Sequence, residues 1–226
     1  MNIAIIIVSY GRKVLLQQTL ESLRASGFAA EHGTITIVDN GSPEDIRSLL
    51  CSWQPYITNL LLLANNKGKP YAWNVGAALA QETCKIQNIS KPDFFLFCDS
   101  DLFFHPNWYT TLVTAWQEHQ HLPLGVISGY RWPAHPIDHI EKGATTQLNI
   151  LRFPTGCCVF ISAASFQING AWDTKRLIRT VDTSYFRAVR ERNMICASIH
   201  PESVIDHTGN KSRTWHLGTG QPKLLP

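Results

Sequence analysis

Residues 94–101 read FFLFCDSD. The five apolar residues Phe94–Cys98 are typical of a strand buried on both faces of a β-sheet, and two carboxylates follow it directly. Such a strand delivers Asp99 and Asp101 into a single loop. Because open α/β sheets bind their ligands beyond the carboxyl ends of the strands, this loop is the first candidate for a functional site.

Three more apolar runs precede this strand. Ile3–Val8, Thr34–Val38 and Asn59–Ala64 each have the pattern of a short buried strand. Leucines at helical spacing over residues 15–23 follow the first run, and a further helix is predicted over Tyr71–Cys84. Strands that alternate with helices predict an α/β fold with a mostly parallel sheet covered on both faces.

The second half of the chain does not keep this alternation. The sequence predicts helices over His105–His119 and Thr180–Arg192, and strands over Leu124–Tyr130, Gln147–Phe153, Thr155–Ser162 and Met194–Ile199. We therefore expect smaller mixed strands beside the parallel sheet. From His207 onward the sequence is polar and contains several glycines and prolines, and a flexible tail is expected over residues 211–226.

The composition excludes several classes of protein. Of the 226 residues, 44% are hydrophobic, which is too many for a disordered chain, and a net charge of +3 does not favour nucleic acid as a partner. At this length we expect one domain over residues 1–210. The apolar runs are far shorter than the ~18–20 residues of a membrane-spanning helix, and the N-terminus does not resemble a signal peptide. A cytoplasmic protein with six reduced cysteines is expected.

Polar residues also follow the other predicted strands, at Ser9–Arg12, Asp39 and Asn65–Lys69. Two carboxylates one residue apart, such as Asp99 and Asp101, repel each other unless a cation lies between them. Proteins usually hold Mg²⁺ or Mn²⁺ with a few carboxylates, completed by substrate phosphates and water. The pattern therefore favours a metal–diphosphate site. The alternative is a solvated turn that caps the helix that follows.

Two common phosphate-binding motifs are missing after the first strand. The chain reads Ser9-Tyr10-Gly11-Arg12-Lys13 there, which matches neither GxGxxG nor GxxxxGK[ST]. If a nucleotide binds, a metal rather than a glycine-rich loop is expected to neutralise its diphosphate.

Five short motifs, in this order along the chain, resemble those of the family 2 glycosyltransferases, which have a GT-A fold. The matching segments are Val8–Arg12, Val38–Ser42, Asn65–Gly68, Asn74–Gly76 and Asp99–Asp101. The resemblance covers roughly residues 3–210. It implies a nucleotide-binding half over residues 1–104 and an acceptor-binding half over residues 105–210.

The resemblance also implies a role for individual residues. Asp39 would contact the base, Asp99 would approach the ribose, and Asp101 would ligate a divalent cation, Mn²⁺ or Mg²⁺, that bridges the two phosphates. His207 resembles the late histidine that completes the metal site in several of these enzymes. The other implied donor contacts are Ser9, Tyr10, Arg12, Asn65, Lys67 and Asn74, with Lys211 and Arg213 of the tail folding over the diphosphate.

The segments Gly170–Asp173 and Val181–Ser184 resemble two later motifs of the family. In inverting members, the second acidic residue of the later motif is the general base that deprotonates the acceptor, and it corresponds to Asp182 here. Val181 and Ser184 depart from the family pattern, which has acidic residues at these positions. The alternative role of Asp182 is to stabilise the N-terminus of its helix.

Two tryptophans are candidates for the acceptor site. Trp132 and Trp172 lie in predicted loops and are expected to stack on a sugar, whereas Trp73, Trp108 and Trp116 lie on predicted helices and are expected in the core. The predicted loop between residues 130 and 142 is expected to determine the acceptor.

Together with these features, the resemblance to the family 2 glycosyltransferases implies a metal-dependent glycosyltransferase of the hexosyltransferase type. It would move a sugar from a nucleoside-diphosphate donor to a glycan or other hydroxyl acceptor, with inversion, as in polysaccharide biosynthesis. One alternative is a sugar nucleotidyltransferase, although the first turn is poor in glycine for that class. Another is a non-catalytic subunit that binds a nucleotide sugar, which the departures at Val181 and Ser184 would suit. Without a transmembrane segment, association with a membrane would be peripheral.

Overall fold

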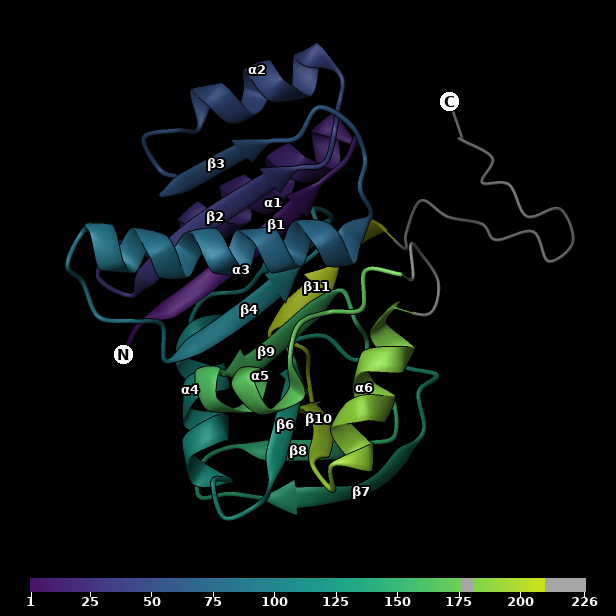
Figure 1. Ribbon diagram of the computed structural model, residues 1–226. Coiled ribbons are helices and arrows are strands. Elements are labelled where there is room, and N and C mark those ends of the chain that lie inside the picture. Colours follow the sequence, from purple (N-terminus) through teal and green to yellow (C-terminus); the bar gives the residue numbers. More distant parts are fainter. Residues whose placement is uncertain (176–180, 210–226) are drawn as a thin grey trace, which may run out of the picture.

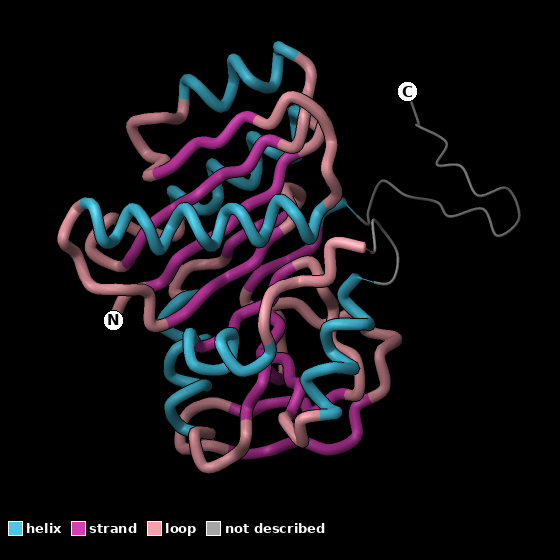
Figure 2. Tube along the Cα trace, viewed as in Figure 1, coloured by secondary structure: helices cyan, strands magenta, loops and turns pink. Residues whose placement is uncertain are grey.

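The computed structural model describes residues 1–175 and 181–209. The described residues form a nine-stranded mixed sheet in the order β3-β2-β1-β4-β9-β6-β10-β8-β7 (Figure 1). Figure 2 shows this sheet as a continuous magenta layer through the molecule. Its strands are β1 Ile3–Ser9, β2 Gly33–Asp39, β3 Asn59–Leu62, β4 Phe94–Cys98, β6 Leu124–Ser128, β7 Ile137–Lys142, β8 Gln147–Leu151, β9 Cys158–Ser162 and β10 Ile195–His200.

The N-terminal part of the sheet is parallel, as predicted. β1 pairs in parallel with β2 and β4, and β2 pairs in parallel with β3. Every residue of β1 is buried because Ile3, Ile5 and Ile7 enter the core on one face of the sheet, while Ala4 and Ile6 enter the core on the other. The carboxyl ends of these four strands therefore lie at the same edge of the sheet.

Helices cover both faces, which confirms the predicted α/β architecture. The helices α1 Lys13–Ala25, α2 Glu44–Ser52 and α4 Trp108–Glu118 contribute to one core, and α3 Lys69–Ile86, α5 Ala163–Asn169 and α6 Val181–Glu191 pack on the other. Figure 1 shows α3, α5 and α6 in front of the sheet and α1 behind it. Within residues 1–175 and 181–209, no helix is both long and apolar enough to cross a membrane.

The structure contains several elements after β4 that the sequence does not predict. Leu102–Phe104 (β5) and Ile205–His207 (β11) form a separate two-stranded antiparallel sheet, α5 follows β9 directly, and the second part of the predicted acceptor loop is the edge strand β7. Three-residue strands are too short to have a recognisable period, and the side chains of β7 are nearly all exposed. His207 therefore lies in a strand and not at the start of a tail. Residues 211–226 lie outside the described residues, and the division of the domain into two halves stays a prediction.

Candidate functional site

The ends of β1, β2 and β4 bring three of the predicted site segments together. Ser9 is paired with Asp39 and Ile7 with Cys98, so the segments that follow β1, β2 and β4 leave the sheet side by side. The main-chain N–H of Asp99 donates to the Cys157 carbonyl oxygen at 2.8 Å, which fixes the loop after β4 to the segment before β9. This edge is where the sequence predicts the site.

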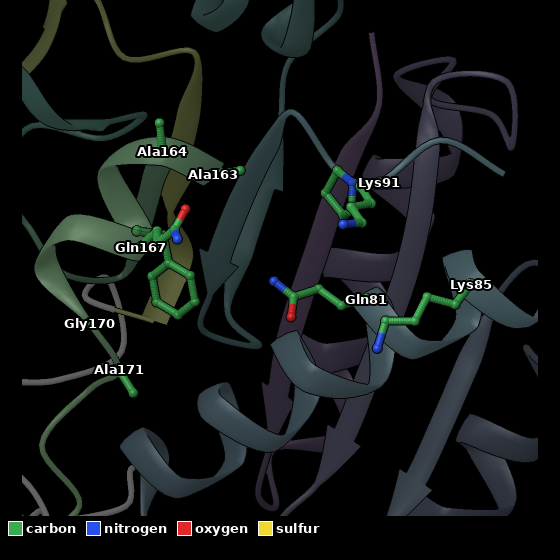
Figure 3. Close-up of a pocket in the computed structure, with 10 residues that line it drawn as sticks. Gln81, Lys85, Lys91, Ala163, Ala164, Gln167, Gly170 and Ala171 are labelled. Atoms are coloured by element: carbon green, nitrogen blue, oxygen red, sulfur yellow. The ribbon is translucent and has the colours of Figure 1, made fainter.

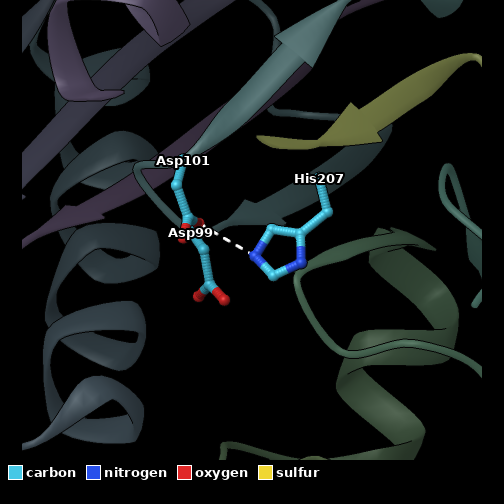
Figure 4. A group of neighbouring side chains, drawn as sticks. All are labelled: Asp99, Asp101 and His207. Atoms are coloured by element: carbon cyan, nitrogen blue, oxygen red, sulfur yellow. Dashed lines mark hydrogen bonds and ion pairs between the residues drawn. The ribbon is translucent and has the colours of Figure 1, made fainter. Parts of the chain in front are cut away.

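Asp99, Asp101 and His207 form a compact group at this edge. Each offers one ligand atom, and these atoms lie within 4.8 Å of one another. His207 Nε2 lies 3.1 Å from Asp101 Oδ1, and Figure 4 shows the imidazole ring and the two carboxylates converging. The short sheet brings these distant residues together, because β11 pairs His207 with Leu102. The main-chain N–H and the hydroxyl of Thr208 both donate to the Asp101 carbonyl at 2.9 Å.

Asp101 is held by two basic side chains. Its carboxylate is 3% exposed and pairs with Arg12 through Oδ2 and with His207 through Oδ1. Burial alone would raise the pKa of Asp101, but the hydrogen bond to His207 and the charges of His207 and Arg12 outweigh it, so the pKa is lowered. Gly209 packs so closely that a side chain there would collide with the Asp101 carboxylate. Asp101 is therefore fixed in its ionised form.

Asp99 and Asp182 share Lys69, which the sequence marks only as the end of the polar segment Asn65–Lys69 and assigns no role. Lys69 Nζ lies 3.2 Å from Asp99 Oδ1 and 3.4 Å from Asp182 Oδ1. Burial raises the pKa of Asp99 to about 6, with Lys69 opposing the shift and Asp101 adding to it. Burial lowers the pKa of Lys69, but attraction to Asp99 and Asp182 exceeds this effect and the net shift is upward. The available signal was the position of Lys69 directly after the polar loop, at the first residue of α3.

Asp182 reaches the site from the first turn of α6. Its carboxylate packs against Gly156, where a side chain would collide with it. The structure thus brings the predicted base to the same edge as Asp99, while a role in stabilising the helix N-terminus is compatible with the same position.

The region that is predicted to bind the nucleobase contains two buried oxygen atoms without hydrogen-bond partners among the described residues. Asp39 is fully buried; its Oδ2 accepts from the Ser42 N–H at 3.1 Å and lies 3.3 Å from Arg47 Nε. Among the described residues, Asp39 Oδ1 and Ser9 Oγ have no hydrogen-bond partner. A buried oxygen without a donor is costly, so both atoms are candidates for contacts with a ligand.

The loops after β2 and β3 are joined by amide groups. Asn40 Nδ2 donates to Asn66 Oδ1 at 2.8 Å, and the Lys67 N–H donates to Asn40 Oδ1 at 2.8 Å. The side chains of Tyr10, Asn65 and Lys67 are exposed beside these loops and are accessible to a ligand.

Two predicted site residues have other roles. Trp172 is only 2% exposed and stacks on Tyr185 with 4.0 Å between ring centroids, so the prediction that it forms a sugar platform is wrong: its loop is covered by α6. Asn74, predicted to bind the donor, uses its amide oxygen and nitrogen to bond the main chain of Trp172, both at 2.9 Å. It tethers a loop to α3. Trp132 is 39% exposed and stays a candidate for the acceptor site.

Lys211 and Arg213, predicted to close over the diphosphate, lie outside the described residues.

A cavity of about 560 Å³ lies away from this group, between α3 and α5 (Figure 3). Its lining includes Lys91 and Pro92, which precede β4, whereas Asp99 follows β4 at the other end of the strand. Figure 3 shows Gln81 and Lys85 of α3 on one side and Gln167 of α5 on the other. None of the predicted site residues lines it, so the cavity and the carboxylate group are separate features.

Comparisons with known proteins support the assignment of the fold. Solved structures similar to the chain include S. aureus TarS 1–349 (14% identity, TM-score 0.66, covering 90% of this chain and 59% of that one). A mannosyltransferase of Pyrobaculum calidifontis, PcManGT, solved with GDP-Man and Mn²⁺, has 13% identity and a TM-score of 0.66, with coverages of 90% and 55%. GalNAc-T7, solved with UDP, GalNAc and Mn²⁺, has 13% identity and a TM-score of 0.66, with coverages of 92% and 44%.

The chain thus spans about half the length of these solved structures. The comparison with curated proteins gives no match. The model of the family described as Glycosyl transferase family 2 matches residues 4–169. Because this match covers most of the sequence, and the sheet and helices match GT-A structures, the chain belongs to glycosyl transferase family 2 and has a GT-A fold.

Proposed function

We propose that the protein is a metal-dependent glycosyltransferase, of the hexosyltransferase type, that moves a sugar from a nucleoside-diphosphate donor to an acceptor hydroxyl. The observation that carries this proposal is the convergence of Asp99, Asp101 and His207 at the carboxyl edge of the sheet, with their ligand atoms within 4.8 Å. Membership of glycosyl transferase family 2 supports the same reaction class.

The side chains of this group suit Mn²⁺ or Mg²⁺. Carboxylate oxygens are the ligands that these ions favour, and His207 Nδ1 is buried without a hydrogen-bond partner among the described residues. We assign Asp101 and His207 as ligands, with Asp99 beside them. Two of the structures similar to this chain were solved with Mn²⁺. When bound, a divalent cation offsets the negative charge that develops on the departing diphosphate.

The two buried oxygen atoms without hydrogen-bond partners, Asp39 Oδ1 and Ser9 Oγ, suit contacts with a nucleobase. Uracil and guanine both carry a ring N–H, and Asp39 Oδ1 offers it a buried acceptor. Ser9 Oγ lies on the neighbouring strand. Tyr10, Arg12, Asn65 and Lys67 lie in the segments that follow β1 and β3, and we propose that they contact the sugar and phosphates of the donor. TarS and PcManGT were solved with UDP-GlcNAc and GDP-Man respectively, so either nucleotide is compatible with this fold.

Asp182 is the proposed general base. Its carboxylate would accept the proton of the acceptor hydroxyl while the acceptor oxygen bonds the anomeric carbon and the bond from that carbon to the diphosphate oxygen breaks. Attack opposite the leaving group inverts the configuration of the sugar. Trp132 is proposed to stack on a glycan acceptor. The cytoplasmic location and any peripheral contact with a membrane stay predictions.

Calorimetric titration of UDP, GDP and dTDP, with and without Mn²⁺, tests the donor and metal sites. One nucleotide is expected to bind about 10–100-fold more tightly with Mn²⁺, and Asp101→Asn is expected to remove this gain. Asp182→Asn should keep the affinity and lose turnover of the nucleotide sugar, and Lys85→Met, at the far end of α3, should behave like the wild type.

If no nucleotide binds, or Mn²⁺ has no effect, the proposal is wrong. Binding without turnover would favour the non-catalytic subunit, and release of pyrophosphate from a nucleoside triphosphate would favour the nucleotidyltransferase.

A further inference from the structure

Lys69 joins three parts of the fold at the proposed site. Its ammonium group lies 3.2 Å from Asp99 Oδ1, after β4, and 3.4 Å from Asp182 Oδ1, on α6. The Gly156 carbonyl oxygen is 3.5 Å away, and the Trp73 ring centroid is 4.4 Å away. The side chain is 26% exposed, so these contacts surround most of it. This position is different from that of a solvated surface lysine.

Each of the three carboxylates at the site pairs with at least one basic side chain. Arg12 and His207 pair with Asp101, whereas Lys69 is the basic group within ion-pair distance of Asp99 and Asp182 among the residues that the structure describes. Asp182 Oδ1 has no hydrogen-bond partner there and depends on this ion pair. Lys69 thus supplies the positive charge between Asp182, the proposed base, and Asp99.

The position of Asp182 depends on an attractive and a steric contact. Asp182 is 33% exposed and can turn toward water, and without a cation its charge would be repelled by Asp99. Gly156 packs so closely against the Asp182 carboxylate that a side chain there would collide with it. Attraction to Lys69 and contact with Gly156 together hold the carboxylate at the edge of the sheet.

We propose that Lys69 is a positioning residue that holds Asp182 beside Asp99, so that the base faces the reacting carbon of the donor. This inference rests on the proposed transferase function and deepens it, since it assigns a role to a residue that neither the motifs nor the family match singled out. Lys69 acts through Asp182. A direct contact of Lys69 with the donor diphosphate is the competing role, and the two roles differ in the kinetic constant that they affect.

The test compares Lys69→Met with Lys69→Arg and with the control Lys85→Met. Lys85 is on the same helix and also pairs with a carboxylate, that of Glu82 at 2.8 Å, but it lies at the far end. In Lys69→Met, kcat is expected to fall about 100-fold, the size of a typical general-base contribution, while the nucleotide Kd and the donor KM change less than about threefold. Lys69→Arg should lose less of kcat than Lys69→Met, and Lys85→Met should keep the kcat of the wild type. Adding Lys69→Met to Asp182→Asn should reduce kcat little further, because both changes disable the same group, the Asp182 carboxylate.

Thermal unfolding without ligands gives a readout that does not need turnover. Lys69→Met leaves two carboxylates without their cation and should lower Tm, and adding Asp182→Asn should restore part of the loss because it removes the repulsion.

Wild-type protein that neither binds nucleotide nor turns over a donor would overturn the proposed function, and the role of Lys69 with it. Active wild-type protein whose Lys69→Met variant keeps kcat within threefold, or loses nucleotide affinity as much as it loses kcat, would overturn the inference about Lys69 alone. The inference about Lys69 would also be overturned if adding Asp182→Asn to Lys69→Met lowered the Tm further.

Discussion

Replacing Trp172 by alanine tests whether this ring belongs to the core. Its centroid lies 4.0 Å from that of Tyr185, 4.6 Å from that of Trp73 and 5.4 Å from that of Phe97. A large buried aromatic ring removes about 150–250 Å² from water, which at ~25 cal/mol per Å² corresponds to about 4–6 kcal/mol. Truncation of buried tryptophans costs about 3–5 kcal/mol. Because domains are stable by only about 5–15 kcal/mol, Trp172→Ala should lose a large part of the free energy of unfolding.

Trp132 provides the matched control. It is 39% exposed, and its main-chain N–H, which alanine retains, donates to Thr155 Oγ1 at 3.0 Å. Trp132→Ala should change the free energy of unfolding by less than about 0.5 kcal/mol, while raising KM for a glycan acceptor and leaving nucleotide binding intact.

Urea unfolding followed by far-UV circular dichroism measures both variants without relying on tryptophan fluorescence. A loss below about 1 kcal/mol for Trp172→Ala, or equal losses for the two variants, would refute the assignment of one ring to the core and the other to the surface.

Three further changes test other parts of the structure. Gly209→Ala forces a methyl group into the Asp101 carboxylate, and calorimetry should record a loss of about 10–100-fold in Mn²⁺-dependent nucleotide affinity, with metal-free affinity unchanged. Asp39→Asn should weaken nucleotide binding about 10–100-fold with or without Mn²⁺, because a hydrogen bond to a charged group contributes about 1.5–3 kcal/mol; unchanged affinity would exclude Asp39 from the base site. Hydrogen bonds from Thr146 and Thr145 lower the pKa of Glu118 from 4.5 to about 2, so its ionised form stabilises the fold above pH 4.5 and that contribution is lost toward pH 2. Urea midpoints of Glu118→Gln should therefore lie below those of the wild type at pH 7 and approach them as the pH falls; a constant difference would contradict this.

The parallel half of the sheet was predictable because its strands are buried on both faces. Ile3–Val8 and Phe94–Cys98 are uninterrupted apolar runs, and both appear as strands within one residue of the predicted ends. The position of Asp39 and Asp99 at one edge follows from parallel pairing alone. For these residues, local sequence and tertiary position agree.

The second half was less predictable because its contacts are long-range. The pairing of Ile205 with Phe104 joins residues with a large sequence separation, and neither three-residue strand has a local signal. The burial of Trp172 could not be predicted for a related reason, because a residue in a loop becomes buried when a helix, here α6, packs over it. The role of Lys69 could not be predicted from the sequence, because it depends on Asp99 and Asp182, which approach Lys69 only in the folded chain.

The segment that matches the family model contains only some of the proposed site residues. The match ends at residue 169, so it includes Asp39, Asp99 and Asp101 but neither Asp182 nor His207. Those two residues reach the site through contacts of their own: β11 pairs with β5 beside Asp101, and Val181 and Tyr185 anchor α6 in the core. The matched segment therefore accounts for the nucleotide side of the proposed reaction. Asp182, the proposed general base, and His207, the second proposed metal ligand, depend on how the rest of the chain packs against the matched segment. Variants that loosen β11 or α6 should therefore impair turnover before they impair recognition of the nucleobase.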